Sequence, residues 1–112
     1  MKNIFTGLAG EIKARKFLKK KKYKIIKTNY RTQFGEIDII ALDKNYVVFV
    51  EVKTRTTTVY GRASEAVNLN KQKHIKNVAL FYLKQNNLLE SNVRFDVIEV
   101  YDNEINHIEN AF

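Results

Sequence analysis

The sequence contains no cysteine, tryptophan or proline among its 112 residues. Without cysteine, the chain can form no disulfide, thiol nucleophile or cysteine-bound zinc site, and its two histidines are too few to build a metal site alone. No apolar run approaches the roughly 20 residues of a membrane-spanning helix, and the N-terminal segment lacks the order of a signal peptide. We therefore expect a cytoplasmic protein with no membrane partner.

The length and the hydrophobic content both indicate one domain. A chain of 112 residues lies within the usual size of a single domain. Its 45% hydrophobic residues are enough for one continuous core but not for a second. We expect a single domain over residues 1–112.

The positive charge is concentrated in one stretch of the chain. Lysine and arginine number 20 against 12 acidic residues, and ten of the basic residues fall in residues 13–31, which contain no acid. This stretch includes the lysine run Lys19, Lys20, Lys21 and Lys22, and also Arg31. Such segregation indicates a polyanionic partner, nucleic acid before membrane. The alternative is a lysine-rich helix end that only meets solvent.

The hydrophobic pattern predicts the order helix, three strands, helix and then one or two strands. The first helix is expected from a cap at Thr6 to about Lys20, and Glu11 falls on its docking face of small residues. The second helix is expected from a cap at Asn70 to about Gln85. The strands are expected at residues 23–30, 36–42, 46–54 and 93–100, with an optional edge strand at 103–110 and a loop at 55–64. This order predicts an α/β fold with a mixed sheet flanked by helices.

Charged residues in the apolar strands carry the chemical argument. Glu51 and Lys53 directly follow an apolar run, and the two-residue period of a strand places them on one face. Asp38 lies in the preceding strand, and a tight turn at 43–45 would bring it beside Glu51. Two neighbouring carboxylates repel each other and favour a divalent cation with oxygen ligands, Mg²⁺ or Mn²⁺. The alternative is a buried salt bridge of Lys53 with either carboxylate, without chemistry.

Six short motifs resemble the small bacterial YraN family in their order and spacing, almost from end to end. They are Gly7-Leu8-Ala9-Gly10-Glu11, Asn29-Tyr30-Arg31, Gly35-Glu36-Ile37-Asp38-Ile39-Ile40-Ala41, Phe49-Val50-Glu51-Val52-Lys53-Thr54-Arg55, Lys71-Gln72 and Arg94-Phe95-Asp96-Val97. That family is similar to PD-(D/E)XK nucleases and to archaeal Holliday junction resolvases. The resemblance implies a restriction-endonuclease-like αβββαβ core, in agreement with the order predicted above.

The resemblance also implies a role for each site residue. Asp38 and Glu51 become the metal carboxylates, Val52 the donor of a backbone carbonyl to the metal, and Glu11 a further carboxylate from the helix. Lys53 becomes the catalytic lysine. The implied activity is a Mg²⁺- or Mn²⁺-dependent endonuclease. Glu36 could support the metal ligands, or it could simply begin its strand.

Several further residues are candidates for contact with nucleic acid. Lys71 and Gln72 lie in the first turn of the second helix and could reach the metal site or a phosphate, but they could equally be surface residues of a helix cap. Arg55 and Arg62 flank the loop and could grip the phosphate backbone, or meet solvent. We expect Asp96 to be the partner of a buried base or a cap, and we assign no function to His74 or His107.

Two functions of different class therefore remain open. The favoured one is a metal-dependent nuclease for structured or branched DNA, in which Lys53 positions the attacking water. The other is a non-catalytic module that binds nucleic acid while Asp38, Glu51 and Lys53 form a structural cluster. Nucleic acid, with DNA favoured, is the expected partner in both, and a homodimer is possible.

Overall fold

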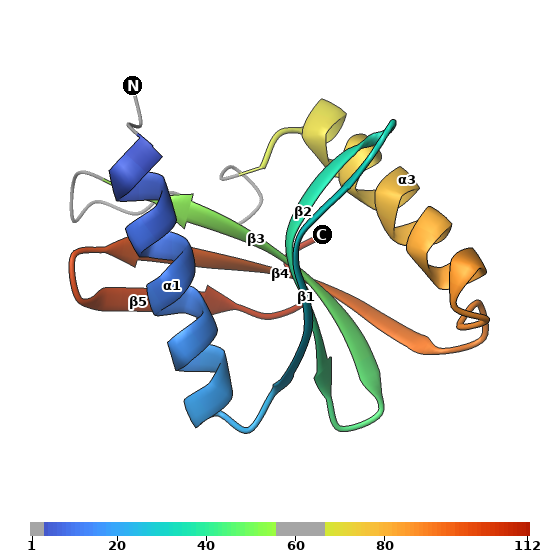
Figure 1. The fold of residues 1–112 in the computed structure, drawn as a ribbon, viewed down its shortest axis with the longest axis horizontal. Coiled ribbons are helices and arrows are strands. Elements are labelled where there is room, and N and C mark those ends of the chain that lie inside the picture. The colour runs from blue at the N-terminus through green and yellow to red at the C-terminus, as the bar shows by residue number, and fades with distance from the viewer. Residues whose placement is uncertain (1–3, 56–66) are drawn as a thin grey trace.

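The computed structural model describes residues 4–55 and 67–112, with side chains from Leu8 onward. Its elements are α1 (Ile4–Lys20), β1 (Lys24–Thr32), β2 (Gly35–Asp43), β3 (Tyr46–Thr54), α3 (Leu69–Gln85), β4 (Asn92–Tyr101) and β5 (Glu104–Ile108) (Figure 1). The order confirms the predicted αβββαβ core, and β5 confirms the optional edge strand.

The five strands form one mixed sheet in the order β1-β2-β3-β4-β5. The pair β3 and β4 is parallel, and the other neighbouring pairs are antiparallel. Parallel strands need a crossover connection, and α3 lies within the crossover between β3 and β4. The carboxyl ends of these two central strands therefore meet at the same edge of the sheet, where open α/β sheets commonly bind ligands.

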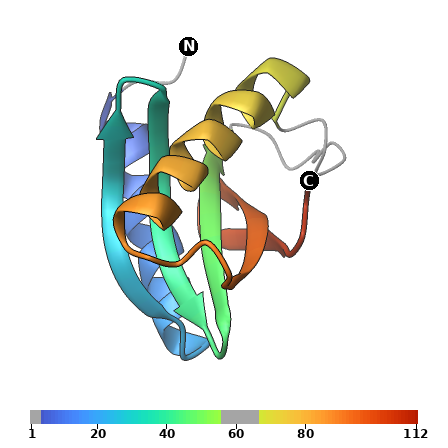
Figure 2. The same ribbon diagram turned by 90° about the vertical axis from the view of Figure 1, so that its right-hand side faces the viewer.

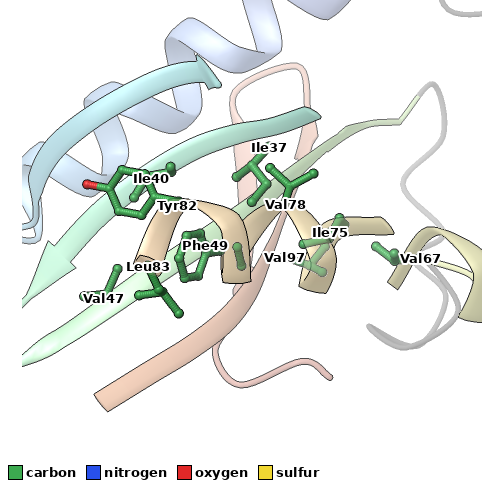
Figure 3. Close-up of a cluster of buried hydrophobic side chains, with 11 residues drawn as sticks. Ile37, Ile40, Val47, Phe49, Val67, Ile75, Val78, Tyr82, Leu83 and Val97 are labelled. Carbon is green, nitrogen blue, oxygen red and sulfur yellow. The ribbon is translucent and has the colours of Figure 1, made fainter. Parts of the chain in front are cut away.

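The helices cover opposite faces of the sheet (Figure 2). Alternate residues of β3 point to opposite faces because the side-chain period of a strand is two. Val48, Val50 and Val52 belong to the core cluster beneath α1, whereas Val47 and Phe49 belong to the cluster beneath α3. Figure 3 shows this second cluster, in which Phe49 lies among side chains of the sheet and of α3. The same alternation places Glu51 and Lys53 on the α3 face.

Helix α1 docks through small and apolar side chains, as predicted. Ala14 and Leu18 are fully buried in the cluster beneath α1. A Cβ atom added to Gly10 would collide with Thr54 Oγ1, so the helix lies against the end of β3 at this point. The helix begins at Ile4, and the predicted cap at Thr6 was wrong because Thr6 lies inside the helix.

Helix α3 begins two residues earlier than predicted. Its N-cap is Asn68, whose side chain accepts a hydrogen bond from the Lys71 backbone N–H at 2.9 Å, so the predicted cap at Asn70 was wrong. The sequence offers asparagine at both positions, and only the backbone path chooses between them. The predicted apolar stripe is confirmed, since it is buried at Ile75, Val78, Ala79 and Tyr82. No helix of the described ranges is long and apolar enough to cross a membrane.

Candidate metal site and nucleic-acid surface

The sheet splits between β2 and β3 at the point where Asp38 lies. Pairing of these strands runs from Asp43 opposite Tyr46 to Ile39 opposite Val50. Beyond that pair, β2 continues beside β1 and β3 continues beside β4. In Figure 1 the β1–β2 hairpin accordingly turns toward α3, away from the end of β3. The two strands therefore separate at one end of the sheet, while each remains paired with its other neighbour.

The Asp38 carboxylate occupies this split. Its Oδ2 atom accepts a hydrogen bond of 2.8 Å from the backbone N–H of Val52. A side chain thus takes the place of a strand partner for this N–H, which would otherwise lose its hydrogen bond where the strands separate. The bond holds Asp38 against Val52, next to Glu51 in the chain, and this agrees with the position predicted from the tight turn between β2 and β3.

Glu51 is the buried acid of the site. Only 6% of its side chain is exposed, and its Oε1 atom lies 3.0 Å from the ammonium of Lys71. Burial, followed by the negative charge of Asp38, raises the pKa of Glu51 above its ordinary value, against the opposing effect of Lys71 and Lys53. The four charges therefore act on one another across β2, β3 and the start of α3.

Lys71 supplies the cation of this group. Its side chain is 44% exposed and reaches Glu51 from the first turn of α3. Burial by itself would lower the pKa of Lys71, but the charge and hydrogen bond of Glu51, together with the charges of Asp38 and Glu36, raise it. Lys71 was predicted to reach either the metal site or a phosphate, and in this structure it contacts Glu51.

Gln72, predicted beside Lys71 as a nucleic-acid contact, instead bonds to its own chain. Its side-chain amide donates a hydrogen bond of 2.8 Å to the backbone carbonyl of Val67. The bond helps to hold the entry to α3, and with it the helix turn that carries Lys71. A contact of Gln72 with nucleic acid stays a prediction.

Glu11 approaches the same end of β3 from α1. The residue follows Gly10, which touches Thr54, and its side chain is half-buried. The helix turn that carries Glu11 therefore lies near the end of the strand that carries Glu51 and Lys53. Its contribution to a shared metal site stays a prediction, as does that of the Val52 carbonyl.

These residues suit a divalent cation by their chemistry. Asp38 and Glu51 offer hard oxygen donors, which Mg²⁺ and Mn²⁺ prefer. The acidic pair already attracts a cation, because the Lys71 ammonium lies against Glu51. The donor set therefore fits the predicted Mg²⁺ or Mn²⁺.

Among the described residues, a group of three possible metal ligands lies at a different place in the structure. Single ligand atoms of Asp96, His107 and Glu109 lie within 4.8 Å of one another. Both Asp96 oxygens, however, accept hydrogen bonds from Arg94, at 2.9 and 3.0 Å, and Asp96 Oδ2 also contacts His107 Nε2 at 2.8 Å. Both oxygens of Asp96 are therefore already bonded to the Arg94 guanidinium in this structure.

The same guanidinium ties this group to more distant parts of the chain. Arg94 contacts Asp43 at 3.0 Å and the Tyr23 hydroxyl at 2.6 Å. Although burial works to raise the pKa of Asp96, hydrogen bonds from His107, Arg94 and the Asn110 backbone lower it below its ordinary value. We call this network the Asp96 cluster, formed by Tyr23, Asp43, Arg94, Asp96, His107 and Glu109.

The Asp96 cluster decides two sequence-based expectations. Asp96 is the partner of a buried base, as predicted. His107, to which no function was assigned, has a side chain that is only 3% exposed, and it joins this network because Asp96 contacts its Nε2 and the Lys21 ammonium contacts its Nδ1 at 2.9 Å. The available signal was Arg94-Phe95-Asp96, since the strand period places its two charged residues on one face.

Glu99 is a buried acid that the sequence reasoning missed. It is fully buried in β4 and pairs in register with Lys53. Its oxygens accept hydrogen bonds from Arg55 at 2.8 Å and from Asn106 at 3.3 Å. Arg55, predicted to grip phosphate, is therefore held by an ion pair with Glu99 in this structure. A charged residue within the apolar run of β4 was the signal that could have revealed Glu99.

The remaining basic candidates that the structure describes lie on the surface. Lys19, Lys20, Lys21 and Lys22 are exposed at the end of α1. Arg31 forms an exposed ion pair of 3.1 Å with Glu36, and Arg62 lies outside the described residues. A groove of about 350 Å³ along α1 adds further positive charge; it is lined by Lys13, Lys16, Phe17, Lys20, Asn103 and Ile105.

Comparison with known proteins gives the family. The model of a family described as "Uncharacterised protein family UPF0102" matches residues 10–100, which include every predicted metal and catalytic residue. The chain belongs to the UPF0102 family. This membership confirms the YraN resemblance, because the two names denote one family.

UPF0102 relatives match the chain over nearly all of its length. A UPF0102 protein of Alkaliphilus oremlandii is 52% identical over 112 residues, covering 95% of this chain and 96% of the relative. One from Caldanaerobacter subterraneus subsp. tengcongensis is 48% identical over 113 residues, covering 95% and 93%. One from Thermodesulfovibrio yellowstonii is 47% identical over 112 residues, covering 100% and 99%. Their names state the family and no activity.

Proposed function

We propose that this UPF0102 protein is a nuclease that uses Mg²⁺ or Mn²⁺ to cleave phosphodiester bonds in structured or branched DNA. The observation that carries the proposal is the buried Glu51 carboxylate beside Asp38, at a split in the sheet and with a cation already against it. An acid whose pKa is shifted by burial and by a neighbouring charge is a candidate for a functional site. The preference for branched DNA comes from the resemblance to resolvases.

Each residue of the site has a defined task in this proposal. Asp38 and Glu51 hold the cation, and Glu11 and the Val52 carbonyl complete its ligands. When bound, the cation would polarise the phosphate and lower the pKa of a water molecule. Lys53, whose charge acts on Glu51, orients the attacking water and balances negative charge near the phosphate. Asp38 stays in place through its bond to the Val52 N–H.

The decisive experiment combines cleavage with a matched pair of substitutions. Wild type is incubated with duplex, flap, four-way-junction and single-stranded DNA in Mg²⁺, in Mn²⁺ and in a chelator. We expect metal-dependent cleavage that Glu51→Gln abolishes. The control is Glu90→Gln, the same chemical change at an exposed residue, which should leave cleavage unchanged. Wild type that cleaves no substrate and unfolds at the same temperature with and without metal would refute the nuclease.

DNA binding is tested separately, in the chelator. We expect electrostatic binding through Lys19, Lys20, Lys21 and Lys22, so affinity should fall by about 0.9 log unit per log unit of salt for each phosphate neutralised. Replacing these four lysines with serine should weaken binding to all sequences alike and make the salt dependence less steep. Binding that does not change with salt would reject the electrostatic surface.

The non-catalytic module remains the second candidate because of two ion pairs. Lys71 balances Glu51 and Arg55 balances Glu99 with no metal required. This candidate predicts salt-sensitive DNA binding with neither cleavage nor a metal effect on unfolding. The two experiments above therefore separate it from the nuclease.

A further inference from the structure

The Glu51 carboxylate needs a positive charge close to it. It is nearly inaccessible to solvent, and the charge of Asp38 makes its ionised form still less favourable. A buried carboxylate is stable only when paired or bound to a metal. In this structure the partner is the ammonium of Lys71, 3.0 Å away. A divalent cation on Glu51 would meet the same need.

The two cations cannot occupy this position together. An ammonium in hydrogen-bond contact with Glu51 Oε1 lies where a cation bound to that oxygen would have to approach, and like charges at such a distance repel strongly in a partly buried site. Binding of one therefore opposes binding of the other. Glu51 is a shared ligand for which Lys71 and the metal compete.

Lys71 can release Glu51 while its backbone stays in place. The backbone N–H of Lys71 is bonded to the Asn68 cap, and the residue belongs to the first turn of a helix of 17 residues. Its side chain is 44% exposed, and lysine carries its charge on a flexible four-carbon stem. The ammonium can therefore turn toward solvent and remain next to the site.

We propose that Lys71 is an exchangeable counter-ion: a divalent cation displaces its ammonium from Glu51, and the displaced ammonium then binds a phosphate of the nucleic acid. The inference rests on the proposed function, because it requires a metal on Asp38 and Glu51. It adds that metal binding prepares the site for its substrate. Without metal, Lys71 stays paired with Glu51, and its own charge is engaged.

The start of α3 suits a phosphate. The N-terminus of a helix carries the positive end of its dipole, which favours an anion nearby. Lys73 and Lys76, both exposed, add positive charge and line a surface groove with Gln72.

The first test measures metal binding alone. Mn²⁺ is titrated calorimetrically into wild type, Lys71→Gln and the control Lys84→Gln, which makes the same change at an exposed residue in the last turn of α3. We expect Lys71→Gln to bind Mn²⁺ about tenfold more tightly than wild type, since the positive charge that competes for Glu51 is gone. Lys84→Gln should match wild type. Lys71→Arg keeps the charge and forms a stronger pair, so it should bind Mn²⁺ less tightly than Lys71→Gln.

The second test measures the coupling between metal and DNA. Affinity for a labelled DNA duplex is measured with Ca²⁺, as a hard cation in place of Mg²⁺, and with a chelator. In wild type, Ca²⁺ should raise DNA affinity by freeing Lys71, and this increase should be clearly smaller in Lys71→Gln and unchanged in Lys84→Gln. A merely structural lysine would alter stability without changing this ratio.

The outcomes separate the inference from the function on which it rests. If wild type binds Mn²⁺ but Lys71→Gln binds it equally or more weakly, the exchange is refuted and the metal site stands. An equal Ca²⁺ effect on DNA affinity in both proteins also refutes it. If neither wild type nor any variant binds Mn²⁺, the proposed function falls together with the exchange.

Discussion

Two acidic clusters in this small protein solve the same electrostatic problem differently. In the Asp96 cluster, buried Asp96 is held by Arg94, whose side chain is only 12% exposed and also contacts Asp43 and Tyr23. In the Glu51 cluster, formed by Asp38, Glu51, Lys53 and Lys71, the close cation is the half-exposed Lys71. Asp96 is held by the rigid, two-pronged guanidinium of Arg94, whereas Glu51 is held by the ammonium of a flexible lysine side chain.

The difference shows how a structural ion pair can be told from a site. A guanidinium that bonds both oxygens of one carboxylate has a fixed geometry, and removing Arg94 takes hydrogen bonds from Asp96, Asp43 and Tyr23 at once. An ammonium that contacts one carboxylate oxygen can be exchanged at a modest cost. The pKa values follow this contrast, since that of Asp96 is lowered by its partners and that of Glu51 is raised by burial and Asp38.

The largest expected effect is the loss of Arg94. Arg94→Met should destabilise the protein by about 3 to 5 kcal/mol, because it leaves Asp96 buried with much of its compensation removed. Urea unfolding measures the change, and Mg²⁺ should not restore the loss. A variant that unfolds within about 1 kcal/mol of wild type would show that the Asp96 cluster is not held by Arg94.

Acid should act on the two clusters in opposite directions. The folded-state pKa of Asp96 is lowered, so its stabilising effect is present above the ordinary value of 3.8 and is lost as the pH falls toward the folded-state pKa. The folded-state pKa of Glu51 is raised, so its ionisation destabilises the fold as the pH rises above the ordinary value of 4.5.

Two amide substitutions test this contrast by urea unfolding across the acid range. Compared with wild type, Asp96→Asn should be least stable at neutral pH and approach wild type as the pH falls below 3.8. Glu51→Gln should gain most relative to wild type at neutral pH and lose that advantage as the pH falls toward 4.5. Parallel profiles for the two variants would contradict the assignment of the clusters.

A smaller effect is expected for Lys71 in the absence of metal. Lys71→Gln should cost about 1 to 2 kcal/mol, less than Arg94→Met, because the glutamine amide can still donate to Glu51 and Lys53 remains. Added Mg²⁺ should recover part of this loss by binding the native state. Thermal unfolding with and without Mg²⁺ measures the loss of stability and its recovery. If Mg²⁺ stabilised Lys71→Gln only as much as it stabilises Arg94→Met, the two clusters would not differ in the way described above.

The smallest effect on stability is expected for Asp38→Asn. The asparagine side-chain oxygen can still accept the Val52 N–H, so stability should change by no more than about 0.5 kcal/mol. Cleavage should nevertheless be abolished, with DNA affinity kept or raised, because less negative charge then faces the phosphates. A cleaving Asp38→Asn protein would exclude Asp38 as a required metal ligand.

The predicted strands lie close to those of the structure because their signals are local. The run at 46–54 was predicted within the bounds of β3, and the turn between β2 and β3 falls at Lys44 and Asn45. The helix starts were harder to predict. Asn68 and Asn70 are equally good caps by residue type, so the start of α3 depends on the path of a chain that must also cross from β3.

The candidate site was predictable in part because some of its signals are also local in the sequence. Asp38 was expected beside Glu51 from a tight turn and a two-residue period, and its bond to Val52 places it there. The contacts of Lys71 with Glu51 and of Arg55 with Glu99 span 20 and 44 positions. No local pattern determines which of several basic residues reaches which acid across such separations.

The sequence by itself determined the order of elements, the faces of the strands and the positions of two buried acids, Glu51 and Asp96, because these follow from periodicity and from the cost of burying charge. Only the tertiary structure decided which cation meets each acid. That choice depends on where the sheet splits and on how α3 and β5 return to it. These long-range placements gave Asp96 a fixed arginine and Glu51 an exchangeable lysine.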